Sequence, residues 1–442
     1  MRYVMRYWRP AGNLCVNGCQ AGEPIYTSVR KELEPSGERI VNHSSVALSA
    51  AATPDLPGAS LAERSAAAAI VAARHAAEVD SAPRFPAESF AAIKAQRLLG
   101  LLAPVELGGE GASVRAVADV CYRLGQACSS TAMIYAMHQV KVACLVRHGR
   151  GSETIERLLR RLCAEQLLLA SSTTEGKGGG NVRSSEAAVE HRNGRIHLER
   201  QATVISYGSQ ADGVVTTARR AADADSSDQV LIAFLREDYT LTRLQGWNTL
   251  GMRGTCSEGY TLKASGSPGQ ILPEPYEGIH ARTMVPFAHL LWGSVWAGIA
   301  AGAAARAQAF VRHAARHAGG QAPPGAPQLT QVLSQLRTLR GVLANSLRTY
   351  ESKMDDPKAL GALDFQSQIT LTKVEVSELA VATVLTALRV CGLSGYRCDS
   401  EFSIERQLRD VLSSPLMINN DRILSSLAST SLMAPVPTSL SD

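Results

Sequence analysis

The sequence predicts a mainly α-helical protein in which a β domain is inserted between two helical parts. Residues 59–170 carry helix-forming and capping signals, residues 171–285 hold short runs rich in Val, Ile and Thr, and residues 286–432 return to long apolar helices. This order predicts an N-terminal α-helical domain, a middle β-barrel or sandwich domain and a C-terminal four-helix bundle.

The first helical part begins with a recognisable cap. Ser60 stands directly before a long Ala-rich run, and serine is a preferred N-cap residue. Pro86 and Glu88 mark the start of a second helix, since both residue types favour the first helical turn. A Gly-rich loop at 108–111 then precedes two further helices with apolar periodicity.

The middle part contains a hairpin signal. Asn193 and Gly194 lie between two short β-prone runs, and Asn-Gly favours the tight turn that joins antiparallel strands. Further strands are predicted in DQVLIAFLRED, YTLTRLQGWNTLG and GYTLKASG.

The C-terminal part contains four predicted helices, the last of them after Asp421. From Val285 to Ala305 no charged residue occurs, which is about the length of a membrane-spanning helix. The run is mostly Ala and Gly, and the spacing of Gly298 and Gly302 allows another helix to approach closely. We therefore predict a buried core helix and no membrane span.

Composition limits the remaining possibilities. A net charge of +5 over 442 residues, without a long Lys/Arg run, predicts no nucleic-acid partner. The nine cysteines are odd in number and, although Cys15 and Cys19 are spaced C-x3-C, no second pair follows, so we predict reduced thiols, a cytoplasmic location and no metal site. Residues 1–58 are predicted to be a disordered extension, with a transit peptide or an early start site as alternatives, and residues 433–442 a flexible tail.

Five stretches, in this order, make the chain resemble the acyl-CoA dehydrogenase superfamily across roughly 60–430. CSSTAMIYAMH (128–138) is similar to the helix that walls the acyl pocket, and TTEGKGGGN (173–181) to the T-E-P-x-x-G-S-D loop. The others are TVISYGSQAD (203–212), WNTLGMRGTCSEGYTL (247–262) and GLSGYRCDSEFSIERQLRD (392–410), which ends in the family's E-R-x-x-R-D string.

The resemblance implies a bound flavin, FAD by preference and FMN as the alternative, between the β domain and the bundle. Matching positions imply these cofactor-binding residues: Thr173, Thr174, Gly179 and Gly180 in the loop, Ser206 in the next strand, and Arg389, Gly392, Gly395 and Asn420 in the C-terminal part. In the family, the turn around Gly392 and Gly395 meets the FAD pyrophosphate of a neighbouring subunit. Val204 stands where a shielding Trp is usual, which implies a more open flavin face.

The family's catalytic carboxylate is missing. Counted from Arg409 and Asp410, the usual Glu position falls on Ile418, and the alternative position on the first bundle helix holds Ala288, next to His289. Abstraction of an α-proton needs a positioned base, and imidazole titrates near neutrality, so His289 is the predicted substitute.

Other side chains near these motifs receive lesser roles. His138 is a weaker candidate for the base. Asp421 is predicted to cap the last helix, and Glu175 to serve the structure.

Three functions remain open from the sequence. The first is α,β-dehydrogenation of an acyl-CoA or acyl-carrier-protein thioester, with electrons passing to an electron-transfer flavoprotein. The second is monooxygenation by reduced flavin and O2, with a flavin reductase as partner, and this reaction needs no α-proton base. The third is a non-catalytic binder of the same fold. The resemblance also implies a homotetramer or homodimer.

Overall fold

The computed structural model of the protein describes residues 58–175, 182–319, 321–433, 436 and 438–439. These residues belong to the larger of two compact units, Ala52–Asp442. The predicted extension before residue 58, most of the predicted tail, and the predicted contacts Gly179 and Gly180 lie outside the described residues.

The N-terminal part is helical, as predicted. Its helices are α1 (Leu61–Ser81), α2 (Ala87–Ala95), α3 (Val114–Ala127), α4 (Ser129–His148) and α5 (Glu153–Glu165). The predicted cap is confirmed, because the Ser60 hydroxyl accepts from the backbone N–H of Glu63 while the Glu63 carboxylate accepts from that of Ser60. Helix α4 is buried over most of its length and forms the centre of this part.

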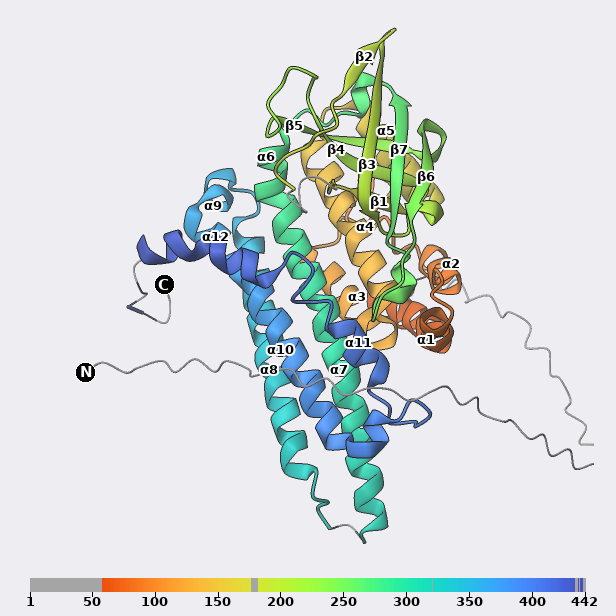
Figure 1. The fold of residues 1–442 in the computed structure, drawn as a ribbon, viewed down its shortest axis with the longest axis vertical. Helices are drawn as coiled ribbons and strands as arrows, with labels where there is room; N and C mark the ends of the chain where they lie inside the picture. The colour runs from red at the N-terminus through yellow and green to blue at the C-terminus, as the bar shows by residue number, and fades with distance from the viewer. Residues whose placement is uncertain (1–57, 176–181, 320, 434–435, 437, 440–442) are drawn as a thin grey trace, which may run out of the picture. The chain divides into compact units, whose positions relative to one another are not determined.

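The β part consists of two sheets (Figure 1). One has the order β1 (Leu169–Ser172), β4 (Gly213–Arg219), β5 (Gln229–Leu235), and the other the order β2 (Glu190–Arg192), β3 (Arg195–Ile205), β7 (Glu258–Gly266), β6 (Tyr239–Gln245). Asn193 and Gly194 have φ values of 51° and 72° and join β2 to β3, which confirms the predicted hairpin. Apolar side chains from both sheets, among them Val214, Phe234 and Leu262, form a separate core.

The C-terminal part contains the long helices α7 (Val285–His317), α8 (Ala326–Lys353) and α10 (Leu363–Tyr396), which run side by side (Figure 1). A short helix α6 (Tyr276–Ile279) and a π-helical turn, His280–Met284, lead into α7. The shorter helices are α9 (Pro357–Gly361), α11 (Glu405–Val411) and α12 (Asn420–Met433), of which α12 packs on α10. Gly392, with φ 54° and ψ −135°, interrupts α10.

The close helix contact predicted from the glycine spacing in α7 is present. A Cβ on Gly298 would lie 2.4 Å from the carbonyl oxygen of Tyr122 and 2.9 Å from the Cα of Gly125, both on α3. Only glycine at this crossing lets the two backbones approach so closely.

Two described helical segments are long and apolar enough to span a membrane by composition alone. In Tyr276–His317, 89% of the apolar window is buried inside the protein, which fits the predicted core helix. In Leu363–Tyr396, which the sequence analysis did not single out, only 50% is buried. Helix α10 therefore leaves an apolar face uncovered by the described part of this chain.

The E-R-x-x-R-D string connects α11 to α1 and to the turn at Leu250–Met252. Asp410 is 2% exposed, and its carboxylate accepts from the backbone N–H of Met252 at 2.6 Å. Arg409 pairs with Asp80 on α1 and donates to the carbonyl oxygen of Leu250 at 2.9 Å. A Cβ on Gly251 would lie 2.2 Å from the carbonyl oxygen of Arg409, so this turn requires glycine. The E-R-x-x-R-D string and the turn at Gly251 and Met252 therefore stabilise the fold through their contact with each other.

Candidate functional site

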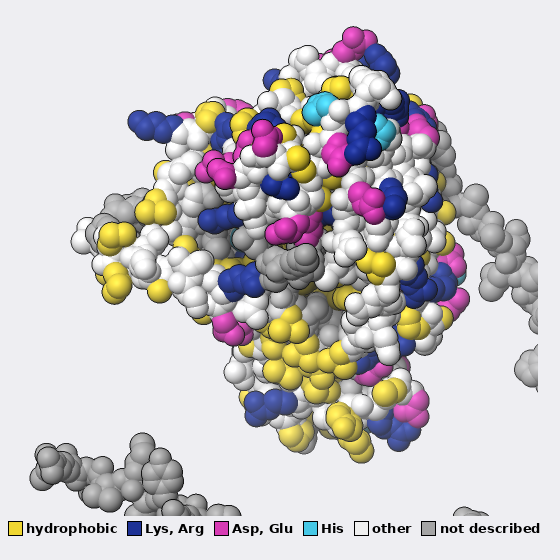
Figure 2. All heavy atoms as spheres, turned by 45° about the horizontal axis from the view of Figure 1, so that its top comes forward, with side chains coloured by type: hydrophobic (Ala, Val, Ile, Leu, Met, Phe, Trp, Pro, Cys, Tyr) yellow, Lys and Arg dark blue, Asp and Glu magenta, His cyan; other side chains and the backbone are white. Residues whose placement is uncertain are grey.

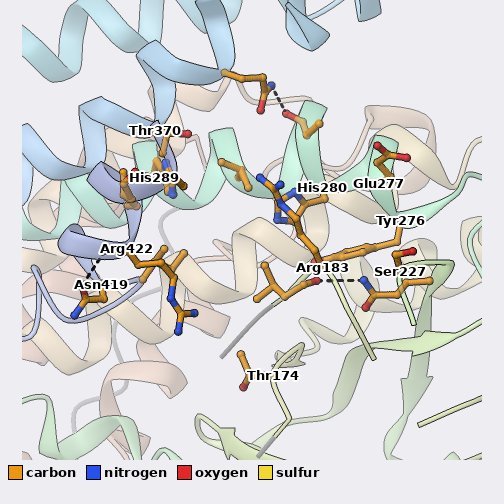
Figure 3. A pocket seen from close by; sticks show the side chains of 18 of the residues that line it. Thr174, Arg183, Ser227, Tyr276, Glu277, His280, His289, Thr370, Asn419 and Arg422 are labelled. Carbon is orange, nitrogen blue, oxygen red and sulfur yellow. Dashed lines mark hydrogen bonds between the residues drawn. The ribbon is translucent and has the colours of Figure 1, made fainter. Parts of the chain in front are cut away.

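A cavity of about 1190 Å³ lies where residues of the β part, α6, α7, α10 and α12 meet (Figure 3). Apolar side chains from the bundle line it at Val285, Leu416, Ile418 and Ile423. The wall also includes Thr174, Arg183, Asp225, Ser227, Asp228, Tyr276, Glu277, His280, His289, Gln366, Thr370, Asn419 and Arg422. Figure 3 shows His289, Thr370, Asn419 and Arg422 on one side and Tyr276, Glu277 and Ser227 on the other. The bundle therefore contributes both apolar side chains and polar groups such as His289 and Thr370, and the wall towards the β part is largely polar.

Of the predicted flavin loop, the structure places Thr174 in the cavity wall, whereas Thr173 is not among the lining residues. The next residue, Glu175, is 7% exposed and accepts backbone N–H groups from Glu186 at 2.5 Å and Ala187 at 3.2 Å. Its carboxylate also lies 3.5 Å from the guanidinium of buried Arg200. Glu175 therefore anchors the start of this loop, in keeping with its predicted structural role.

Ser206 lies outside the described cavity wall. Its hydroxyl is 2.8 Å from that of Ser257, which in turn is 2.8 Å from the hydroxyl of Thr255. Val204, two residues earlier, is 37% exposed. The structure thus does not bring Ser206 and Thr174 together around one described cavity.

Arg389, Gly392 and Gly395 lie on α10 and do not line the cavity either. Near them, Leu393 and Tyr396 are 73% and 75% exposed. Arg389 and Gly392 are exposed at a surface of this chain, where the resemblance implies a neighbouring subunit, whereas Gly395 is buried.

Ile418, at the usual position of the carboxylate, lines the cavity, and its φ is 47°. Positive φ is unfavourable for a β-branched residue. Asn420 points instead into the bundle, where its side-chain oxygen accepts from Lys373 at 2.6 Å and its amide donates to Glu378 at 2.6 Å. The structure thus does not place the side chain of Asn420 among the described cavity-lining groups.

The prediction that Asp421 caps the last helix is wrong. Helix α12 begins one residue earlier, at Asn420, and the side-chain oxygen of Asn419 accepts from the backbone N–H of Arg422 at 3.1 Å. Asparagine is a preferred N-cap residue, and of Asn419 and Asn420 it is Asn419, directly after the turn at Ile418, that caps the helix.

His289 is 2% exposed and lines the same cavity as Ile418. Its Nδ1 lies 3.0 Å from the carbonyl oxygen of Ile369. A carbonyl oxygen only accepts, so Nδ1 carries the hydrogen and Nε2 of the neutral ring is the acceptor. Burial lowers the pKa of His289 to about 4, and the charge of Lys373 acts in the same direction. The ring is therefore neutral near pH 7 with Nε2 as its acceptor, and the low pKa makes it a weaker base than a free imidazole.

His138 is ruled out as a comparable base by its hydrogen bonds. Its Nε2 lies 2.9 Å from the carbonyl oxygen of Leu99, and its Nδ1 accepts from the backbone N–H of Leu169 at 3.0 Å. Both ring nitrogens are used inside the core, and His138 does not line the cavity.

His280 is a cavity residue that the sequence analysis missed. It belongs to the π-helical turn before α7, and its ring packs edge-on against Tyr276, with 5.5 Å between ring centroids. Burial lowers its pKa to about 4, as does the charge of Arg183. The sequence offers no signal for His280, because nothing in GIHARTM predicts the π-helical turn, a feature that often occurs at functional sites.

The residues present fit a planar ring system together with a substrate. The volume of about 1190 Å³ exceeds the roughly 300–1,000 Å³ of pockets that hold one drug-sized ligand. The hydroxyl of Thr174, the face of Tyr276 and the neutral imidazoles offer hydrogen bonds and flat contact surfaces.

A cluster of His75, Glu78 and Glu88 brings three possible metal ligands within 4.8 Å of one another. Arg84 donates to Glu78 at 3.0 Å and to Glu88 at 2.9 Å. Because the guanidinium already satisfies both carboxylates, we assign no metal to this cluster.

Comparisons with known proteins agree with the fold and the motifs. Residues 61–166 match the family "Acyl-CoA dehydrogenase, N-terminal domain". A cyclohex-1-ene-1-carbonyl-CoA dehydrogenase from Geobacter metallireducens is 26% identical over 372 residues, which is 82% of this chain and 94% of that protein.

Solved structures extend the similarity in fold. FMN-bound TdsC from Paenibacillus sp. A11-2, a dibenzothiophene monooxygenase, has a TM-score of 0.75 at 19% identity, covering 86% of this chain and 98% of that one. The methanesulfinate monooxygenase MsuC from Pseudomonas fluorescens has a TM-score of 0.73 at 19% identity, covering 86% and 99%.

Proposed function

Because the chain belongs to the acyl-CoA dehydrogenase superfamily, we propose that it is a flavin-dependent oxidoreductase that forms an α,β double bond in an acyl thioester. The observation that carries the proposal is that His289 and Ile418 line one cavity, so a proton acceptor shares the cavity with the position where the family keeps its carboxylate. The name of the Geobacter relative supports a thioester substrate.

The proposed cofactor is FAD, with FMN as the alternative that the FMN-bound neighbour supports. Thr174 would hold the flavin from the β side of the cavity. When bound, the flavin supplies the acceptor for the hydride that leaves the β-carbon of the substrate.

The chain's own contribution is to orient the thioester and move one proton. The apolar wall formed by Val285, Leu416 and Ile423 suits an acyl group. Nε2 of His289 takes the α-proton while the hydride leaves the β-carbon, so the two electrons of the α C–H bond form the new double bond. The hydrogen bond from Nδ1 to Ile369 keeps Nε2 in the acceptor state that this step requires.

Monooxygenation by reduced flavin and O2 is the second candidate. The specific observation in its favour is Ile418, because that reaction needs no α-proton base and no carboxylate stands at this position. The monooxygenases among the structural neighbours support it as well.

Two kinds of partner belong to the proposal. An electron-transfer flavoprotein would take electrons from a dehydrogenase, and a flavin reductase would supply reduced flavin to a monooxygenase.

We also propose a cytoplasmic homotetramer or homodimer, because Leu385, Leu393 and Tyr396 expose apolar surface along α10. On the face drawn in Figure 2, hydrophobic side chains gather into a patch among interspersed acidic and basic groups.

The reaction is tested by an anaerobic titration. Purified protein loaded with FAD is mixed with a panel of acyl-CoAs while the visible absorbance of oxidised flavin is followed. Bleaching by an acyl-CoA supports dehydrogenation. Absence of bleaching, with O2-dependent product once reduced flavin is supplied, supports the monooxygenase. Failure to retain FAD or FMN contradicts both and favours a non-catalytic binder.

A further inference from the structure

Behind the cavity wall lies a buried lysine that the proposed reaction does not use. Lys373, on α10, is 0% exposed. Its ammonium donates to the carbonyl oxygen of Ile418 at 2.7 Å and to the side-chain oxygen of Asn420 at 2.6 Å. It also lies 5.6 Å from the ring centroid of Trp296 on α7. Moving an ammonium group out of water is unfavourable in free energy, so the charged form of Lys373 depends on these hydrogen bonds.

The acceptors of Lys373 belong to the turn that carries Ile418 into the cavity wall. Asn420 is fixed further by donating to Glu378 at 2.6 Å and to the Ser377 hydroxyl at 3.0 Å. Ser414, at the start of the same segment, donates to the carbonyl oxygen of Ser377 at 3.3 Å. The segment from Ser414 to Asn420 is thus tied to one stretch of α10.

The backbone at Ile418 has a conformation that β-branched residues rarely adopt. Its φ of 47° lies in the left-handed region, which is unfavourable for β-branched residues. The side chain is 40% exposed, so burial of Ile418 itself supplies little compensation. The hydrogen bond from Lys373 to its carbonyl oxygen acts directly on this strained residue.

We propose that Lys373 is a positioning residue that holds Ile418 in the left-handed conformation and thereby fixes the apolar end of the substrate cavity. Without the bond to the Ile418 carbonyl, the residue relaxes to negative φ. Its side chain then leaves its place in the wall of the cavity where an acyl group is proposed to lie. The effect on catalysis rests on the proposed function, whereas the effect on the backbone does not.

The test compares Lys373→Met with the wild type in ligand-free crystal structures. Methionine fills a similar volume without a donor. We expect φ of Ile418 to become negative in Lys373→Met and to stay positive in the wild type, in Lys373→Arg, and in the control Lys358→Met, whose lysine is exposed on α9. An unchanged positive φ in Lys373→Met overturns the proposal.

Kinetics separate positioning from general loss of structure. With an acyl-CoA that bleaches the wild-type flavin, we expect KM to rise about tenfold in Lys373→Met and kcat to change less than KM, although loss of the lysine charge also acts on His289. Lys373→Arg is expected to restore part of the affinity. A fall in kcat with unchanged KM, at full flavin content, contradicts the proposal.

The two proposals fail separately. If no acyl-CoA bleaches the wild-type flavin, the proposed reaction is wrong, but the φ of Ile418 still decides the role of Lys373. If Lys373→Met does not fold, Lys373→Gln, which is shorter and keeps a polar end, replaces it in the same crystallographic comparison.

Discussion

The Nδ1–H of His289 is donated to the carbonyl oxygen of Ile369 at 3.0 Å, which fixes the tautomer of a buried imidazole in the cavity wall. In His289→Gln we expect turnover of the best acyl-CoA to fall by roughly 10²-fold or more, because the amide accepts no proton. Steady-state turnover and single-turnover flavin bleaching measure the effect. The exposed His191→Gln is the matched control. An unchanged rate in His289→Gln removes this imidazole from the mechanism.

A carboxylate at position 418 is expected to replace the missing base. Ile418 and His289 line the same cavity, so Ile418→Glu in the His289→Gln background places an acceptor near the same substrate carbon. We expect at least a roughly tenfold recovery of anaerobic flavin bleaching over His289→Gln alone. If the double variant retains flavin and recovers nothing, monooxygenation becomes the better proposal.

Removing the Asp410 carboxylate should destabilise the fold. In Asp410→Ala the backbone N–H of Met252 loses its acceptor in a buried place, which costs roughly 1–3 kcal/mol or more. Urea unfolding measures the loss. Asp399→Ala is the control, since that side chain is 70% exposed in its pair with Arg397 and such pairs contribute about 0–1 kcal/mol. Equal stability of the two variants would contradict the role given to Asp410.

Two glycines in helices should respond in opposite directions to alanine. Gly298→Ala forces α7 away from α3, because the new Cβ would lie 2.4 Å from the Tyr122 oxygen, and we expect a loss of roughly 1–3 kcal/mol. At Gly341 on α8 nothing lies within 4 Å of an added Cβ. Gly341→Ala is therefore expected to gain about 0.5–1 kcal/mol from helix propensity. Thermal unfolding of both variants provides the check, and a loss in both would show that the contact at Gly298 is not the cause.

Stability should fall in mild acid. Burial lowers the pKa of His138 and of His289 to about 4, whereas imidazoles in the unfolded chain titrate near pH 6.5. Between these values the unfolded state binds more protons, so stability is lost as the pH falls from about 6.5 towards 4. Each imidazole contributes at most roughly 3 kcal/mol. Urea unfolding over this range should show a weaker pH dependence in His289→Gln than in His191→Gln, and identical slopes would argue against a neutral buried His289.

Local signals predicted much of the fold. The Ser60 cap and the Asn193–Gly194 turn depend on neighbouring residues, so the sequence contains all the information they need. The glycine spacing in α7 predicted a close helix contact, although not that α3 is the partner. Partners far apart in the chain leave no periodic signal.

The site was less accessible to prediction for the same reason. Ile418 was identified by its distance from Arg409 and Asp410, but its left-handed backbone depends on Lys373, 45 positions away. His280, which lines the cavity, belongs to a π-helical turn, and composition does not reveal such a turn. The choice of Asn419 over Asp421 as the cap depends on the turn immediately before it.

The bond between Asp410 and Met252 also affects how distant relatives are recognised. The strings on either side of it are among those that carry the resemblance, yet neither residue lines the cavity. Selection for a stable fold alone would preserve both strings while the substrate and the chemistry changed. Sequence similarity in the strings around Met252 and Asp410 is therefore evidence of a common fold. The type of reaction has to be judged from the cavity residues, among them Ile418 and His289.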